Sequence, residues 1–219
     1  MKTDFTRTLD SYTARRDEIR VVEVPPLRYL MVDGHGDPNS APEYAEALEA
    51  LYPLAYTLKF ASKRDLDRDY VVPPLEGLWW AHDMAAFTTT RDKSAWDWTM
   101  MILLPPWLTA EHVAAARDTV GARKAGARLE RVRVDGLDER LCLQTLHVGP
   151  FDHEGPVLAE LHERAIPGRG LVATGKHHEI YLSDPRRTAP EKLRTILRQP
   201  VRPASGDSRT HLAAPVAVS

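Results

Sequence analysis

The sequence predicts an α+β fold in which two β-α-β-β modules, related by a pseudo-twofold axis, form one antiparallel sheet. The composition, 43% hydrophobic and 27% charged over 219 residues, is typical of a soluble domain with a substantial core. The order strand, helix, strand, strand occurs twice along the chain. A unit of this kind buries one face of its strands under its helix. We therefore expect helices on one face of the sheet and a ligand cleft on the other.

The first module is expected over residues 19–108. It opens with two short strands in "IRVVEVPPLRYLMVDGHG", broken at Pro25-Pro26. A helix follows in "EYAEALEALYPLAYTLKF", and Ser40 is a suitable cap for it. Two further strands are predicted in "PLEGLWWAHD" and "WDWTMMILLPP".

The second module is expected over residues 126–202, after a linking helix at 109–125 that Thr109 caps. Its opening strands lie in "ARLERVRVDGLDERLCLQTLHVGPF", its helix in "VLAELHERAI", and its last strands in "HHEIYLSDP" and "KLRTILRQPV". Residues 1–18 are predicted to be a mobile leader or a lone helix, and 203–219 a disordered tail.

Charge and composition exclude several classes of partner. With a net charge of −2, the chain has no excess of positive charge with which to bind a phosphate backbone, so no nucleic-acid partner is expected. No apolar run is long enough to span a bilayer, and the charged N-terminus is not a signal peptide. The single cysteine, Cys142, is predicted to be a buried apolar residue. These features predict a cytoplasmic protein, either a monomer or a homodimer.

The strand "HHEIYLSDP" carries a carboxylate where a strand seldom holds one. Ile180 and Leu182 alternate with other residues, so Glu179 and Tyr181 share the opposite face. A mid-strand carboxylate is costly to bury without a purpose. Glu179 is therefore a candidate catalytic or ligand-binding group, with Tyr181 beside it. The alternative is an exposed edge carboxylate, or one paired with Arg186.

Four of the five tryptophans fall in two clusters. Trp79 and Trp80 are adjacent in a strand, so one of them must leave the core. Trp96 and Trp98 share a face that Met100 continues. We predict Trp79 and Trp98 as walls of a cleft for a flat ligand, with Met100 beside them. The alternative is that one cluster packs beneath a helix.

Three further residues are candidates. Tyr56 forms an i,i+4 pair with Tyr52, so its hydroxyl either reaches the edge of the cleft or belongs to a core stripe. Gln144 is a polar amide among apolar neighbours and would need a partner if buried. Aligning the two halves places Glu76 as a possible counterpart of Glu179.

Neither a metal nor a cofactor is predicted. Phosphate-binding and nucleophile-elbow motifs do not occur. His177 and His178 are neighbours on a strand and face apart. The acidic and histidine residues of the loop before the second helix fit no standard zinc spacing; they are His147, Asp152, His153 and Glu154.

Several motifs together resemble the GyrI-like small-molecule-binding domain proteins. They are "LYPLAYTLKF", "PLEGLWW", "WDWTMMILLPPWLT", "LCLQTLHVGPFDHEGP" and "HHEIYLSDPRRTAPEKLRTILRQPV", between about residues 18 and 202. The chain is most similar to the stand-alone branch that includes the cyclopropanoid cyclopropyl hydrolases. The resemblance implies two SHS2-type modules around a cleft for flat aromatic, often cationic molecules, with Glu179 at its floor.

For an enzyme of that branch, the resemblance implies hydrolysis of a spirocyclopropyl cyclohexadienone, a DNA-alkylating antibiotic, which protects the cell. Glu179 would deprotonate a water, Tyr56 or Tyr181 would meet the developing phenolate, and tryptophans 79 and 98 would clamp the aromatic plane. The main alternative is a binder that sequesters planar or cationic molecules without turnover. A weaker alternative is a protein partner of gyrase.

Overall fold

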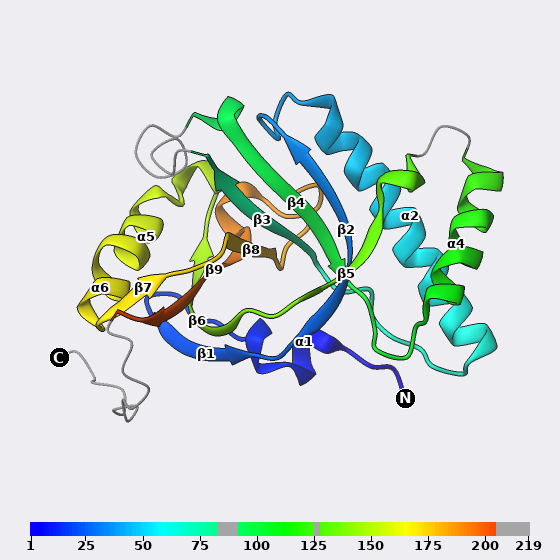
Figure 1. Ribbon diagram of the computed structural model, residues 1–219, viewed down its shortest axis with the longest axis horizontal. Coiled ribbons are helices and arrows are strands. Elements are labelled where there is room, and N and C mark those ends of the chain that lie inside the picture. The colour runs from blue at the N-terminus through cyan, green and yellow to red at the C-terminus, as the bar shows by residue number, and fades with distance from the viewer. Residues whose placement is uncertain (83–91, 125–127, 205–219) are drawn as a thin grey trace.

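The computed structural model describes residues 1–82, 92–124 and 128–204, and the described strands form one antiparallel sheet (Figure 1). The order is β1-β6-β9-β8-β3-β4-β2-β5, and β7 pairs with β9 beside this path. The strands are β1 (Arg20–Val24), β2 (Leu27–His35), β3 (Leu75–Ala81), β4 (Trp96–Leu103), β5 (Arg133–Leu137), β6 (Arg140–Val148), β7 (Leu171–Ala173), β8 (His177–Tyr181) and β9 (Arg194–Pro203).

The doubled order of elements is confirmed. The first module is β2, α2 (Pro42–Asp65), β3 and β4. The second is β6, a helical segment over 155–168, β8 and β9. The modules meet where β3 pairs with β8, and Gly77 lies opposite Glu179 at this seam. The α+β class and the two-module architecture were therefore predictable from the order of elements alone.

The outermost strands are exchanged between the modules. β1 pairs with β6 of the second module, and β5 pairs with β2 of the first. Val24 faces Arg140 and Leu27 faces Leu137, so both ladders keep one register across the break at Pro25-Pro26. The proline nitrogens carry no hydrogen to donate, which explains the break. The two ends of the sheet are thereby tied together, and the face that carries Tyr29, Leu78 and Ile180 is enclosed.

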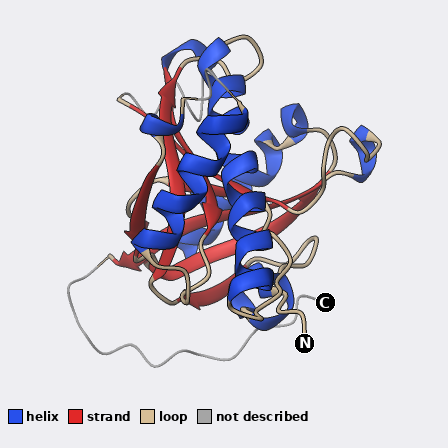
Figure 2. Ribbon diagram, turned by 90° about the vertical axis from the view of Figure 1, so that its right-hand side faces the viewer, coloured by secondary structure: helices blue, strands red, loops and turns tan. Residues whose placement is uncertain are grey.

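Helices cover the other face, which we call the helix face. α2 and α4 (Ala110–Arg123) lie over the first module (Figure 2). Over the second module run α5 (Gly155–Ala159), the π-helical turn η5 (Glu160–Ala165) and α6 (Ile166–Gly168). No helix within the described residues has the length and apolar character that crossing a bilayer requires. The short helices are α1 (Phe5–Thr8), η1 (Asp10–Tyr12), η2 (Lys93–Ala95), η3 (Leu129–Arg131), η4 (Phe151–His153) and η6 (Pro190–Lys192).

Two helix boundaries differ from the prediction. α2 continues to Asp65, beyond the predicted helix in "EYAEALEALYPLAYTLKF", and its N-cap residue is Ala41 rather than Ser40. Pro42 at the first helical position fixes the start of the helix, because its missing N–H needs no partner there. The linking helix begins at the predicted cap, where His112 Nδ1 accepts a hydrogen bond from the Thr109 backbone N–H at 3.1 Å.

The first residues are part of the fold rather than a leader. Ser11 and Tyr12 are buried, and α1 and η1 pack on the enclosed face. The Tyr12 hydroxyl donates to Glu76, and Arg198 donates to the Ser11 carbonyl. These partners lie far along the chain, which is why the local pattern did not show them. The predicted disordered tail falls outside the described residues beyond position 204.

Replacing Gly34 by alanine should strongly destabilise the protein. A Cβ at position 34 would lie 2.0 Å from the nearest atom of the Trp98 ring, which is fully buried between β4 and α2. Because the ring cannot move aside without repacking the core, we expect a loss of about 1–3 kcal/mol in the free energy of unfolding. Urea denaturation measures it, with Gly168→Ala as the control, since no atom lies within 4 Å of a Cβ there.

Candidate functional site

Strand β8 places its alternate side chains on opposite faces of the sheet. Glu179 faces Gly77 and Leu197, and Tyr181 follows it on the helix face. His178 and Ile180 point to the enclosed face. The pairing of Glu179 with Tyr181 is as predicted. The face is not the one expected, because Glu179 lies on the face that carries the helices, at the seam between the two modules, and not on the face opposite them.

Glu179 ends a chain of hydrogen-bond donors. The Tyr181 hydroxyl donates to Glu179 Oε2 at 2.7 Å, and the Trp79 indole N–H donates to the Tyr181 hydroxyl oxygen at 3.0 Å. His177 Nε2 lies 3.8 Å from Glu179 Oε1. A Cβ at Gly77 would lie only 2.7 Å from Trp79 Nε1 and 3.1 Å from the Tyr181 hydroxyl. Because Gly77 has no Cβ, there is room beside it for the hydrogen bonds that join Trp79, Tyr181 and Glu179.

The protonation states of the neighbours suit this arrangement. Burial, and then the charge of Glu179, raise the pKa of Tyr181 well above its ordinary value. Burial lowers the pKa of His177 well below its ordinary value, and His162 lowers it further. Tyr181 therefore remains a donor and His177 remains neutral near pH 7. Glu179 itself is 8% exposed, so its carboxylate is mostly withdrawn from water.

Aromatic rings surround this carboxylate. Tyr44 of α2 stacks on Trp79 with ring centroids 6.5 Å apart, and Phe151 of η4 meets Tyr181 edge-on at 5.6 Å. Burial and the charge of Glu179 raise the pKa of Tyr44. Glu154, also buried, adds a second negative charge that acts on Tyr181.

Sequence reasoning did not assign Tyr44, Phe151 or Glu154 to this site. The available signal was the spacing of Tyr44 from Tyr52, eight residues or about two helical turns. No local pattern brings Phe151 or Glu154 to β8, because their loop meets that strand only in the folded chain.

Trp98 and Met100 do not line a cleft. Both are fully buried in the core between β4 and α2. Trp98 donates its indole N–H to the Gly36 carbonyl at 3.2 Å and meets Tyr44 edge-on at 5.4 Å. The alternative stated above, a cluster packed beneath a helix, holds for these two residues because α2 crosses the face that they share.

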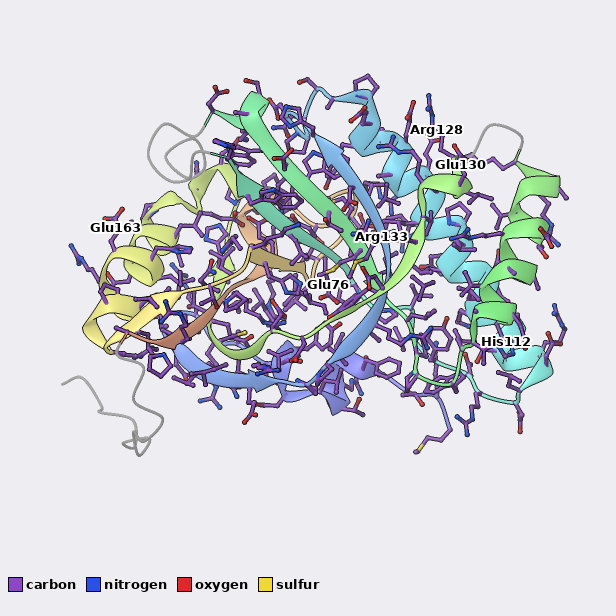
Figure 3. All side chains as sticks on the ribbon, viewed as in Figure 1. Glu76, His112, Arg128, Glu130, Arg133 and Glu163 are labelled. Atoms are coloured by element: carbon purple, nitrogen blue, oxygen red, sulfur yellow. The ribbon has the colours of Figure 1, made fainter. Side chains whose placement is uncertain are left out.

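Glu76 and Gln144 lie on the enclosed face, away from Glu179. Glu76 (labelled in Figure 3) sits directly opposite Ile180 on the neighbouring strand, so the register points it to the enclosed face, where Ile180 lies. It accepts hydrogen bonds from Tyr12 and from His178, the latter at 2.9 Å. Gln144 accepts from Arg198 Nε at 2.9 Å and donates to the Thr13 carbonyl at 2.8 Å. Glu76 is therefore not the counterpart of Glu179. Glu76 and Gln144 belong instead to a buried polar network on the enclosed face.

Tyr56 is on the outer part of α2 and is 48% exposed. It acts electrostatically on Tyr52 and on Arg186, which belongs to the loop after β8. Arg186 pairs with Asp184 at 3.0 Å. The hydroxyl of Tyr56 is thus accessible at the edge of the helix face. No group of three or more metal-ligating side chains occurs among the described residues.

Comparison with known proteins identifies the family. A model of the GyrI-like small molecule binding domain matches residues 17–202. The crystal structure of an uncharacterized conserved protein from Listeria innocua is 40% identical, with a TM-score of 0.83. A hydrolase from the same organism is 38% identical, with a TM-score of 0.79. Each alignment covers 92% of this chain and 100% of the other.

A more distant structure agrees in fold alone. The C-terminal domain of EcmrR is 11% identical, has a TM-score of 0.52, and aligns over 85% of this chain and 98% of that one. The comparison with curated proteins finds no match. Because the family model matches most of its length, the chain belongs to the family of GyrI-like small molecule binding domain proteins.

Proposed function

We propose that the protein is a hydrolase that adds water to the cyclopropane ring of spirocyclopropyl cyclohexadienone antibiotics, with Glu179 as the general base. The observation that carries the proposal is the donor chain from the Trp79 indole through the Tyr181 hydroxyl to Glu179 Oε2. It fixes the orientation of the carboxylate, as a general base requires. The description of the 38%-identical Listeria protein as a hydrolase supports a hydrolytic activity.

The proposed reaction adds one water molecule across a strained carbon–carbon bond of the ring. Glu179 takes a proton from the water, and the oxygen forms a bond to the ring methylene. The strained carbon–carbon bond breaks, and its electron pair passes into the dienone, which becomes a phenolate. Protonation of the phenolate completes the product. Relief of ring strain and gain of aromaticity drive the reaction, so a positioned base and a stabilised oxyanion are sufficient.

The remaining roles follow from where each side chain lies. Tyr181 is a positioning residue, because its hydroxyl donates its proton to Glu179. Tyr44 supplies the aromatic surface; Trp79, on which it stacks, and Trp98, which it meets edge-on, are both buried and support it from the core. Tyr56, exposed at the edge of α2, is the proposed donor to the phenolate oxygen.

The alternative function is a binder of planar aromatic or cationic molecules that performs no chemistry. One observation favours it: two buried carboxylates, Glu179 and Glu154, act on the same tyrosine among aromatic rings. Such an arrangement stabilises a delocalised cation. In this case Glu179 supplies charge and accepts no proton.

Product analysis distinguishes the two functions. The protein is incubated with an excess of a spirocyclopropyl cyclohexadienone, and the compound is followed by mass spectrometry. The hydrolase converts many equivalents into a product heavier by one water, at a rate above that of the buffer reaction. Recovery of unchanged compound, apart from one bound equivalent, would establish the binder and reject the hydrolase.

Replacing Tyr181 by phenylalanine should lower kcat by about tenfold or more, because Glu179 loses the hydrogen bond that orients it. Since the ring itself is retained, KM should change less than kcat. Steady-state kinetics of the variant measure both parameters. A KM effect with unchanged kcat would show instead that Tyr181 contacts the ligand.

A further inference from the structure

A cavity of about 420 Å³ lies on the enclosed face of the sheet, opposite the face that carries Glu179. Its floor is apolar and consists of Met31 and Leu78. Thr99, Arg133 and Lys176 line its sides (Arg133 is labelled in Figure 3). The end of β5 and the turn to β6, residues 135–139, also line the cavity, as do Thr174, Gly175 and Pro200. The cavity is large enough for a small organic molecule.

A bulge in the strand presents Lys176 to this cavity. β7 and β8 pair with the same strand, β9, with Ala173 facing Val201 and His178 facing Arg198. The chain from β7 to β8 thus holds two more residues than the stretch of β9 that it accompanies. Gly175, at a φ of 62°, takes the left-handed conformation that the bulge requires. The bulge turns the chain so that residues 174 to 176 line the cavity.

The ammonium of Lys176 rests on an aromatic ring rather than on a carboxylate. Its Nζ lies 3.1 Å from the centroid of the Trp80 ring. In the described part of the chain no carboxylate comes within ion-pair distance of it, although Asp33 and Asp97 act on it from farther away. Burial lowers its pKa, and the charge of Arg133 adds to this. Other lysines pair with carboxylates within 4 Å; they are Lys59, Lys63, Lys93 and Lys124.

The acidic residues of the cavity have cationic partners of their own. Arg133 donates to Asp33 through Nη2 at 3.1 Å, and its Nε lies 3.7 Å from Asp135. Asp138 pairs with Arg140 at 3.1 Å. Glu139 pairs with Arg198 at 2.9 Å. Among the described residues, these contacts therefore leave the ammonium of Lys176, which lines the cavity, without a carboxylate at ion-pair distance.

We propose that this cavity is a second small-molecule site, which binds an organic carboxylate through Lys176. The ammonium donates to the carboxylate while Trp80 covers its other side, and the apolar part of the ligand lies on Met31 and Leu78. A charge-assisted hydrogen bond in a half-buried setting is stronger than its counterpart in water. The site does not depend on Glu179, because the two lie on opposite faces of the sheet.

The experiment uses benzoate as the probe and Trp80 as the reporter. The full chain is labelled with 5-fluorotryptophan, and the Trp80 resonance is assigned with Trp80→Phe. We expect benzoate to shift that resonance saturably in ¹⁹F NMR. The neutral analogue benzamide should bind at least about tenfold more weakly than benzoate. Equal shifts with benzamide, or no saturable shift with benzoate, would overturn the proposal.

Three variants sharpen the test. Lys176→Met keeps the aliphatic stem and should weaken benzoate binding about tenfold or more, whereas Lys176→Arg keeps the charge and should retain it. Lys192→Met, at an exposed lysine, is the matched control and should bind as the wild type does. Glu179→Gln should leave the response unchanged, so failure of the hydrolase proposal does not affect this result. Benzoate binding by Lys176→Met at wild-type strength would contradict the assignment.

Discussion

Glu179→Gln should lower the rate of ring opening by about 100- to 10,000-fold, the contribution of a positioned general base. The amide keeps the size of the side chain and can still accept the Tyr181 hydrogen bond that Glu179 Oε2 accepts at 2.7 Å. It cannot take a proton from water. The geometry of the site is thus retained while its basicity is removed. Single-turnover kinetics with a spirocyclopropyl cyclohexadienone measure the chemical step directly.

The matched control is Glu191→Gln, the same exchange at an exposed carboxylate in the loop between β8 and β9. It should react at the wild-type rate. Thermal denaturation of both variants establishes that they are folded. Ring opening by Glu179→Gln at the rate of the control would exclude Glu179 as the base.

The same variant also tests the binder. If Glu179 only supplies charge, Glu179→Gln should weaken the binding of a planar cation. The affinity for a neutral planar molecule of similar size should stay unchanged. Isothermal titration with such a pair measures the difference. An equal loss for both ligands would indicate a change of shape rather than of charge.

Local periodicity predicted those parts of the site that lie within one strand. Alternation along β8 placed Glu179 and Tyr181 on one face, and the structure joins them by a hydrogen bond. The order of elements predicted the paired modules and their seam. Both inferences depend only on neighbours in the chain and on the geometry of a strand.

Periodicity could not predict which face is covered. Trp98 and Met100 share a face as expected, but the path of α2 buries them, and that path is a tertiary feature. For Glu76, the side of the sheet depends on the register between β3 and β8. A shift of one residue moves a side chain to the other face. An alignment of the two halves by their order of elements is not accurate to one residue, so it could not assign Glu76 to a face.

The enclosed face holds a charged network that no sequence pattern indicated. His178 contacts Glu76 through Nε2 at 2.9 Å and Glu139 through Nδ1 at 3.0 Å. Arg198 donates to Glu139 at 2.9 Å. Because both ring nitrogens of His178 face carboxylate oxygens, both must donate, and the ring is a cation. Two positive and two negative side chains thus balance, although they come from distant parts of the sequence.

Glu139→Gln should reduce the free energy of unfolding by about 3–5 kcal/mol, because it removes one anion and leaves two buried cations with only Glu76. Urea denaturation measures the loss, and Glu130→Gln, on the exposed face of η3, is the control that should stay within about 0.5 kcal/mol of the wild type. A loss below about 1 kcal/mol would show that water reaches the network and screens it.

The network should also set the pH dependence of stability. Burial alone would raise the pKa of Glu139, but His178 and Arg198 outweigh it and lower the value to about 2. Its contribution is therefore present above the unfolded pKa of about 4.5 and is lost as the pH falls toward 2. Burial alone would lower the pKa of His178, but the carboxylates of Glu139 and Glu76 raise it above 6.5.

The contribution of His178 is consequently present below about pH 6.5 and is lost as the pH rises through its folded pKa. Both contributions coexist between about pH 4.5 and 6.5, where the wild type should be most stable relative to Glu139→Gln. Thermal denaturation of the two proteins from pH 3 to 9 measures this difference. A difference in melting temperature between the two proteins that stays constant across this pH range would mean that neither Glu139 nor His178 changes its pKa on folding.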